Sequence, residues 1–249
     1  MSDTKFEGER IAKVMARAGV CSRRDAERLI NEGKVTLNGA VLDSPAINVK
    51  SSDRIVVDGV PIAAAKSTRL WRYHKPAGLV VTHKDPQERP TIFEHLPKSM
   101  GRVVSVGRLD MDTEGMLLLT NDGELSRFLE LPSTGWVRYY RVRVHGKVDK
   151  AKLDHLKKGI EIDGISYGPI TAKIERTETT STWLSFSLRE GKNREIRRVC
   201  EHLRLHITRL IRTTYGPFQL VNLKPGDVEE VPAKVIANKI GTKFGSDKK

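Results

Sequence analysis

Cysteine and aromatic residues are scarce in this 249-residue sequence, which contains two cysteines, Cys21 and Cys200, and only 6% Phe, Trp and Tyr. Two thiols cannot supply a disulfide framework or the four closely spaced ligands of a structural zinc site. The sequence also has no GxxxxGK[ST] loop, GxGxxG turn, HExxH motif or CxxC motif. We therefore expect no metal ion, nucleotide or nicotinamide cofactor.

Long apolar runs are missing as well. No segment approaches the roughly 18 apolar residues that span a bilayer, and the first ten residues, MSDTKFEGER, contain no apolar core of a secretory signal. Hydrophobic residues make up 38% of the chain and charged residues 30%, which is typical of a globular protein. We expect a cytoplasmic protein that has no membrane partner.

Acidic residues are outnumbered, with 31 Asp and Glu against 44 Lys and Arg, so that the formal net charge is +13. Such an excess indicates a polyanionic partner, because each basic group that docks on a phosphate releases condensed counterions. Membrane surfaces are anionic too, but we find no basic amphipathic helix with Trp or Phe on its apolar face. Nucleic acid is therefore the expected partner.

The first part of the chain, residues 8–62, is predicted to be a small domain. Apolar spacing indicates two short helices within residues 9–32, and turn signals indicate hairpins at 35–42 and 54–62. Five basic residues lie on the two helices, which indicates either a nucleic-acid-binding surface or an ordinary solvated face. They are Arg10, Lys13, Arg17, Arg23 and Arg24. Residues 63–68 are small and polar and are predicted to be a linker.

The second part, residues 69–240, is predicted to mix strands with helices. The strands are expected at 70–74, 79–82, 102–106, 115–120, 137–144 and 183–188, and the helices at 123–130, 150–158 and 193–202. Strand and helix do not alternate regularly, which favours an α+β fold with a mixed, largely antiparallel sheet and flanking helices. Residues 241–249 are predicted to be a disordered tail.

Three segments have the composition of a chemical site. Residues 107–115, GRLDMDTEG, place three carboxylates and an arginine between two apolar segments, where charge is costly unless it is partnered. Residues 190–198, EGKNREIRR, place Arg194, Arg197 and Arg198 on one helical ridge that can bind phosphates or reach a carboxylate. Residues 138–144, RYYRVRV, place Tyr140 on the apolar face of a strand, where it either packs in the core or stacks on a base.

Residues 9–58, centred on CSRRDAERLINEGKVTLNG, resemble the S4 RNA-binding domain. The remainder resembles the pseudouridine synthases that act on small-subunit and large-subunit ribosomal RNA. The resemblance is carried by four motifs in the expected order: HKPAGLVVTHKDPQERPTIFEHLP, GRLDMDTEGMLLLTNDGEL, RYYRVRV and EGKNREIRRVCEHL. Within this family, GKNREIRR and LIRTTYGPF are more similar to the branch that acts on 23S RNA than to the 16S branch.

This resemblance implies that the catalytic aspartate is Asp110, the active-site tyrosine is Tyr140 and the basic partner of the aspartate is Arg197. The reaction breaks the glycosidic C–N bond of a uridine and rejoins the sugar to C5 of the uracil. It needs an ionised carboxylate near the sugar, and an arginine at bonding distance favours the charged form. Tyr140 is expected to stack on the uridine, which must leave its base stack. Whether the carboxylate attacks the sugar or accepts a proton stays open.

The basic residues of both parts are expected to contact the RNA. They are Arg10, Lys13, Arg17, Arg23, Arg24, Lys34, Lys75, Arg108, Lys192, Asn193, Arg194 and Arg198. The expected partner is 23S ribosomal RNA or a ribosomal assembly intermediate, and we expect a monomer. The alternatives are a 16S pseudouridine synthase and a non-catalytic S4-type assembly factor. An S4-linked methyltransferase would need a glycine-rich adenosylmethionine loop, which is absent.

Overall fold

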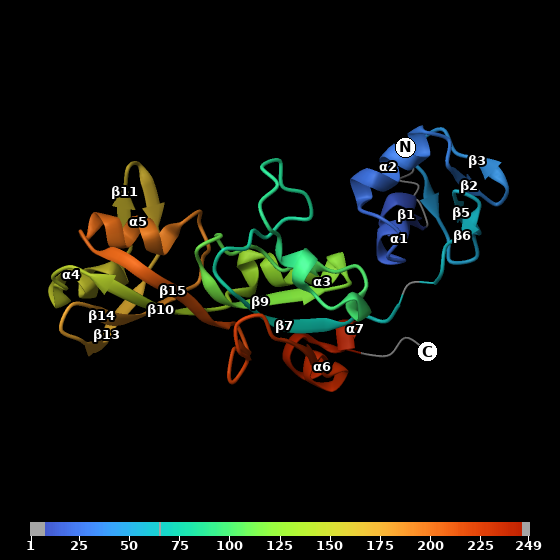
Figure 1. Cartoon of the computed structure of the whole chain (residues 1–249). Coiled ribbons are helices and arrows are strands. Elements are labelled where there is room, and N and C mark those ends of the chain that lie inside the picture. The colour runs from blue at the N-terminus through green and yellow to red at the C-terminus, as the bar shows by residue number, and fades with distance from the viewer. Residues whose placement is uncertain (1–7, 65, 246–249) are drawn as a thin grey trace, which may run out of the picture.

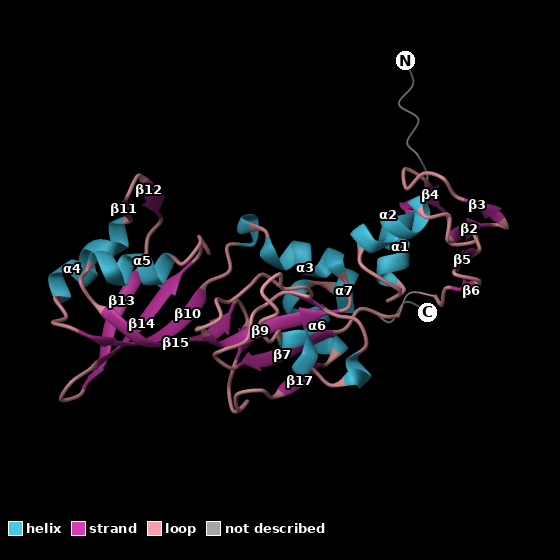
Figure 2. Cartoon of the chain, turned by 45° about the horizontal axis from the view of Figure 1, so that its top comes forward, coloured by secondary structure: helices cyan, strands magenta, loops and turns pink. Residues whose placement is uncertain are grey.

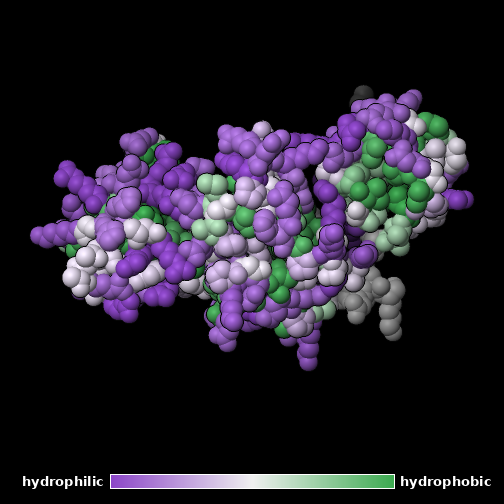
Figure 3. Space-filling model, in the orientation of Figure 1, coloured by the Kyte–Doolittle hydropathy of each residue, from purple (hydrophilic) through white to green (hydrophobic). Residues whose placement is uncertain are grey.

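The fold was analysed in a computed structural model, which describes residues 8–64 and 66–245. Figure 1 shows a small N-terminal part of helices and short strands beside a longer body built on one extended sheet. Hydrophilic residues cover most of the face seen in Figure 3, and apolar residues gather mainly on the N-terminal part. None of the helices within the described residues is long and apolar enough to cross a membrane.

The N-terminal part consists of two helices packed on short strands. Its elements are β1 (Glu9–Arg10), α1 (Ile11–Arg17), α2 (Arg23–Asn31), β2 (Val35–Leu37), β3 (Ala40–Val41), β4 (Asn48–Val49), β5 (Ile55–Val57) and β6 (Val60–Pro61). Helix α2 begins where the Ser22 hydroxyl accepts a hydrogen bond from the Asp25 amide at 3.0 Å, as an N-cap serine does. Ile11, Met15 and Ile30 are fully buried between the helices and the sheet. The predicted helix pair and both hairpins are confirmed.

A nine-stranded sheet forms the body, with the central order β13-β14-β10-β15-β9-β7-β17. Its strands are β7 (Leu70–Lys75), β8 (Val104–Ser105), β9 (Glu114–Thr120), β10 (Arg138–His145), β13 (Thr171–Thr177), β14 (Thr182–Leu188), β15 (His206–Tyr215), β16 (Phe218–Gln219) and β17 (Val228–Val231). The strand pairs are antiparallel except β9 with β15. The predicted α+β class with a mixed, largely antiparallel sheet is confirmed.

Helices cover the two halves of this sheet separately (Figure 2). The β10–β14 half carries α4 (Lys150–His155), α5 (Glu195–His202) and the hairpin of β11 (Ile160–Ile162) and β12 (Ile165–Tyr167), whereas the β7–β9 half carries α3 (Gly123–Glu130), α6 (Ala233–Ile240) and α7 (Thr242–Gly245). Short 3₁₀ turns lie at Ile92–His95, Lys98–Met100, Pro132–Thr134 and Leu156–Lys158. Each half therefore has its own apolar core.

Strand β9 is buried on both faces, which explains its apolar sequence. Met116 and Leu118 pack in the cluster that contains the α3 side chains. Leu117 and Leu119 point to the other face, where the segment after β7 contributes Ile92 and other apolar side chains. The loop that precedes β9 is thus attached to one of the most deeply buried strands of the molecule.

Several expectations need correction. Residues 79–82 form an isolated bridge between Val80 and Thr91 instead of a strand, and the strand expected at 102–106 is shortened to β8. The sequence did not predict β13, β15, β17 or α6. The prediction of a disordered tail is wrong for α7, because Phe244 is buried in the core beneath α3. Residues 246–249 lie outside the described residues, as does residue 65 of the predicted linker.

The two halves of the sheet meet where β9 and β15 run in parallel, with Gly115 opposite Arg212. A Cβ atom at Gly115 would lie 2.2 Å from the Arg212 carbonyl oxygen, and the backbone φ of Gly115 is +107°. Both the contact and the torsion require glycine at this position. The close approach brings β15 and its neighbour β10 against the end of the loop that carries Asp110.

We expect Gly115→Ala to lower the free energy of unfolding by about 2–4 kcal/mol, because the backbones of β9 and β15 must separate to admit the methyl group. Chemical denaturation measures this loss. Gly123→Ala is the matched control, since a Cβ there meets no atom within 4 Å. Equal stability of the two variants would show that the strands are not in the close contact described here.

Candidate active site

The acidic loop of residues 107–113 connects β8 to β9 and holds Asp110 at the surface of the core. Leu109 is buried beside it, and the Thr113 amide donates to the Asp110 carbonyl at 3.0 Å, which closes a tight turn. The side chain of Asp110 is 34% exposed. The carboxylate is thus fixed on a rigid turn while it stays open to a ligand.

Lys75, at the end of β7, fixes the same loop from below. Its ammonium group donates to the carbonyl oxygens of Pro76, Met111 and Thr113 at 2.9, 3.1 and 2.9 Å. The side chain is completely buried, and burial lowers the pKa of Lys75 to about 8. The expectation that Lys75 contacts RNA is therefore wrong, since all three donors are used inside the protein.

Arg197 on α5 reaches across to this loop from the other half of the sheet. Its Nε atom lies 3.5 Å from Asp110 Oδ2, and its Nη2 atom lies 3.0 Å from both Asp112 Oδ1 and Thr113 Oγ1. The Arg197 side chain is only 14% exposed. The contact with Asp110 is an ion pair without hydrogen-bond geometry, which leaves the Nε donor unpaired in the described residues. One guanidinium therefore ties α5 to the Asp110 loop.

Arg194 brings a second positive charge to the same oxygen, with Nη1 3.5 Å from Asp110 Oδ2. It precedes α5 in the left-handed conformation, with φ +51°. Its side chain is 49% exposed, so it can also turn to a phosphate. Two guanidinium groups thus flank one carboxylate oxygen, and the sequence predicted both arginines as site residues.

Tyr140 lies in β10, whose register relates it to the loop. Tyr140 is paired with Phe186 of β14 on one side and with Arg212 of β15 on the other, and Arg212 is paired in turn with Gly115. Two strand spacings, about 10 Å, therefore separate the backbones of Tyr140 and Gly115. Tyr140 is half-buried against the core of its half, whereas its neighbour Tyr139 is 47% exposed on the opposite face. Its proposed contact with the base stays a prediction.

Two further pairs that the sequence did not reveal hold this region. Arg209 of β15 forms two hydrogen bonds, of 2.9 and 2.8 Å, with Glu114 at the start of β9, and these bonds lower the pKa of Glu114. Glu195, at the start of α5, is buried and accepts a bond from the Lys192 amide at 3.0 Å. Burial raises the pKa of Glu195 to about 7. The pairing of Arg209 with Glu114 joins residues 95 positions apart and depends on the tertiary fold, so it leaves no local signal in the sequence.

The other predicted RNA contacts divide by exposure and pairing. Six of them have no ion pair in the described residues, and five of these six are exposed, while Arg198 is half-buried. The six are Arg10, Arg23, Arg24, Arg108, Asn193 and Arg198. Lys34 and Lys192 are exposed but pair with Glu32 and Glu190. Lys13 pairs with Glu9 and Glu124, and Arg17 lies 3.6 Å from Glu9. No group of His, Cys, Asp and Glu in residues 8–64 and 66–245 could hold a metal ion.

We expect stability to depend on pH through Glu195. Its folded pKa lies above the ordinary value of 4.5, so the folded chain keeps a proton that the unfolded chain releases between pH 4.5 and 7. As the pH rises through that window, this group alone therefore lowers the free energy of unfolding by roughly 1.4 kcal/mol per pH unit. Glu195→Gln should remove this slope in denaturation experiments at several pH values.

The control for this prediction is Glu201→Gln, an exposed carboxylate on the same helix, which should leave the pH dependence of the wild type unchanged. If Glu195→Gln shows the wild-type slope between pH 4.5 and 7, the carboxyl of Glu195 is not held protonated in the folded chain.

Comparisons with known proteins agree on the family. The model of the RNA pseudouridylate synthase family matches residues 69–202, and that of the S4 domain matches residues 9–55. An uncharacterised RNA pseudouridine synthase of Rickettsia bellii is 50% identical over 91% of this chain and 98% of its own length. A ribosomal large subunit pseudouridine synthase B of Pasteurella multocida is 40% identical over 90% of this chain and 67% of its own.

A solved structure agrees with these matches. The crystal structure of a pseudouridylate synthase superposes with a TM-score of 0.64 at 25% identity, over 92% of this chain and 98% of that one. The family match covers the acidic loop, Tyr140 and the whole of α5. The sequence relatives, the solved structure and the two family models lead to one conclusion: this chain belongs to the RNA pseudouridine synthase family and carries an N-terminal S4 domain.

Proposed function

We propose that this pseudouridine synthase isomerises a uridine of 23S ribosomal RNA and that Asp110 is its catalytic carboxylate. The observation that carries the proposal is the half-exposed Asp110 carboxylate, held on a tight turn with the guanidinium groups of Arg194 and Arg197 at 3.5 Å. The ribosomal large subunit synthase of Pasteurella multocida, 40% identical, supports the choice of large-subunit RNA.

The chemistry assigns a role to each group. The C1′–N1 bond of the uridine breaks, the uracil turns, C5 bonds to C1′, and the C5 proton leaves while N1 gains one. Asp110 acts at the sugar, as a nucleophile at C1′ or as a proton acceptor, and both routes need it ionised. The guanidinium groups of Arg194 and Arg197 place positive charge 3.5 Å from the Asp110 Oδ2 atom. Tyr140 lies on β10, two strands away from β9, where its ring can stack on the extruded base.

Lys75 and Arg197 act as positioning residues in this scheme. Lys75 binds the carbonyl oxygens of Met111 and Thr113, on either side of Asp112. Arg197 binds the carboxylate and the carbonyl oxygen of Asp112. The turn that presents Asp110 is therefore attached to β7 and to α5, on opposite halves of the sheet. Such preorganisation keeps the carboxylate in place before the uridine arrives.

We also propose the division of labour along the chain. Residues 8–62 bind RNA, residues 63–68 link the parts, and residues 69–240 catalyse the reaction, in a monomer that acts in the cytoplasm where ribosomes assemble. The non-catalytic alternative is disfavoured because an assembly factor has no need of an acid between two guanidinium groups. Activity on 16S RNA is the competing substrate assignment and forms one arm of the test.

We expect Asp110→Asn to abolish isomerisation of a 23S transcript, with a loss of about 10²–10⁴-fold in rate because the amide can neither attack nor accept a proton. Pseudouridine is read as carbodiimide-dependent stops of reverse transcription, since the product has the mass of the substrate. Asp154→Asn is the control, because Asp154 is an exposed carboxylate on α4, outside the acidic loop, and we expect this variant to retain the wild-type activity.

A 16S transcript serves as the substrate control and should remain unmodified. Wild-type activity in Asp110→Asn would remove Asp110 from the mechanism, and modification of 16S RNA alone would replace the substrate assignment.

A further inference from the structure

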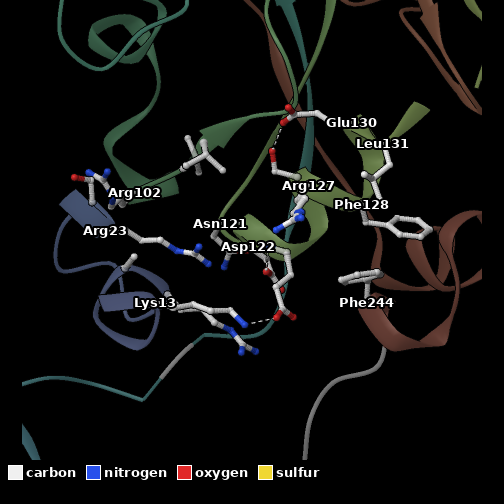
Figure 4. A pocket seen from close by; sticks show the side chains of 18 of the residues that line it. Lys13, Arg23, Arg102, Asn121, Asp122, Arg127, Phe128, Glu130, Leu131 and Phe244 are labelled. Atoms are coloured by element: carbon white, nitrogen blue, oxygen red, sulfur yellow. Dashed lines mark hydrogen bonds and ion pairs between the residues drawn. The ribbon is translucent and has the colours of Figure 1, made fainter. Parts of the chain in front are cut away.

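A deep cleft separates the S4 domain from the catalytic domain, away from the acidic loop. Its volume is about 970 Å³, and it is lined by α1 and α2 on one side and by α3, α7 and the segment before β8 on the other. Figure 4 shows basic side chains that enter it from both domains: Lys13 and Arg23 from the S4 helices, Arg102 from the segment before β8 and Arg127 from α3. We call this space the interdomain cleft.

The interdomain cleft carries an excess of positive charge, with six basic and three acidic side chains in its lining. The three acids are occupied. Glu124 pairs with Lys13, Asp122 caps α3 and accepts from Thr68, and Glu130 accepts from Ser126.

Three guanidinium groups are left without a carboxylate partner in the described residues: those of Arg23, Arg102 and Arg127. Arg23 and Arg127 are exposed, and Arg102 is half-buried. Arginines that converge on a solvent-filled space without acids to neutralise them make a site for anions such as phosphates.

An aromatic ring lies beside these arginines. Phe128 on α3 is 37% exposed, and its ring meets that of Phe244 on α7 with centroids 5.5 Å apart. Because Phe244 is buried, it supports Phe128 from behind. An exposed ring in a positively charged groove is how proteins hold single-stranded nucleic acid, because any base can stack on the ring while the groove binds the backbone. An acidic protein partner would use the charge but has no specific need of the ring.

The two walls of the interdomain cleft are joined by an ion pair. The Lys13 ammonium binds the carboxylate of Glu124, in the first turn of α3, and also that of Glu9. The hydrogen bonds to these two carboxylates raise the pKa of Lys13 despite its partial burial. Lys13, expected from the sequence to contact RNA, therefore acts first in docking the S4 domain on the catalytic domain. The spacing of Arg23 and Arg127 across the cleft follows from this docking.

The interdomain cleft lies at the far end of β9 from the reacting uridine. The acidic loop precedes Glu114 at the start of β9, and the cleft residues Asn121–Glu124 follow Thr120 at its end. Seven residues of strand span roughly 20 Å, at about 3.3 Å per residue. RNA in the cleft is therefore a part of the substrate remote from the flipped nucleotide.

We propose that the interdomain cleft binds a single-stranded segment of the substrate RNA, with its phosphates on Arg23, Arg102 and Arg127 and a base against Phe128. This inference builds on the proposed function, because it takes RNA as the substrate. The cleft contributes to the affinity for RNA and not to the rate of the chemical step, because Asp110 is not among the residues that line it. The S4 domain and α3 together form a second binding site for the RNA. Through its affinity, this site favours RNAs that have a single-stranded segment at a distance from the modified nucleotide.

The test compares Arg102→Ala, Arg127→Ala and Phe128→Ala with wild type on a transcribed 23S RNA. Each arginine variant should raise the Kd about tenfold and reduce the slope of log affinity against log salt by roughly 0.7 to 0.9, for one lost phosphate contact. Phe128→Ala should raise the Kd several-fold with an unchanged salt slope, because stacking releases no counterions. Single-turnover rates at saturating RNA should equal that of wild type in all three.

Arg176→Ala is the matched control, because Arg176 is 69% exposed and pairs with Glu178 on the opposite edge of the sheet. Thermal unfolding checks that each variant folds. If wild type modifies the RNA while the cleft variants keep its Kd and its salt slope, the cleft does not bind RNA and the proposal is wrong. If wild type modifies no ribosomal RNA, the proposed function fails instead.

Discussion

The Arg197 guanidinium holds together the two halves of the catalytic domain at the point where chemistry is proposed. It starts from α5, which packs on the β10–β14 half, and ends on the loop that leads into β9 in the other half. It contacts the carboxylates of Asp110 and Asp112, the Asp112 carbonyl oxygen and the Thr113 hydroxyl. A side chain that is only 14% exposed and makes such contacts sets the relative position of both halves. The geometry around Asp110 depends on it.

The close packing of β9 against β15 explains why a single arginine side chain can span from α5 to the acidic loop. β9 and β15 approach so closely at Gly115 that no Cβ fits between them, and the pair of Arg209 with Glu114 closes the same junction from the surface. Beneath the loop, Lys75 gives up its hydration to bind three carbonyl oxygens. The acidic loop is thus fixed by buried contacts, whereas Arg108 and Arg194 beside Asp110 are exposed.

Sequence reasoning predicted the elements whose pattern is local. Clear periodicity is present in the helix at 123–130, in the two S4 helices and in β14, whereas β7 and β9 are marked by short runs of mostly buried residues. Four ordered motifs led to Asp110, Tyr140 and Arg197. It missed β15, because a strand that crosses from one half to the other alternates between polar and apolar neighbours without a clean pattern. It misassigned Lys75, because composition cannot distinguish a lysine that binds phosphate from one that binds backbone carbonyls. It read Lys13 only as an RNA contact, since its partner Glu124 lies 111 residues away.

We propose that Arg197 holds Asp110 in the position from which it acts, and single-turnover kinetics of Arg197→Gln on a 23S transcript measures this contribution. The glutamine keeps a neutral donor on the ridge but removes the charge beside the carboxylate. We expect the rate constant at saturating RNA to fall by at least about tenfold, with an unchanged Kd because the cleft and the S4 domain still bind the RNA. A wild-type rate constant in this variant would contradict it.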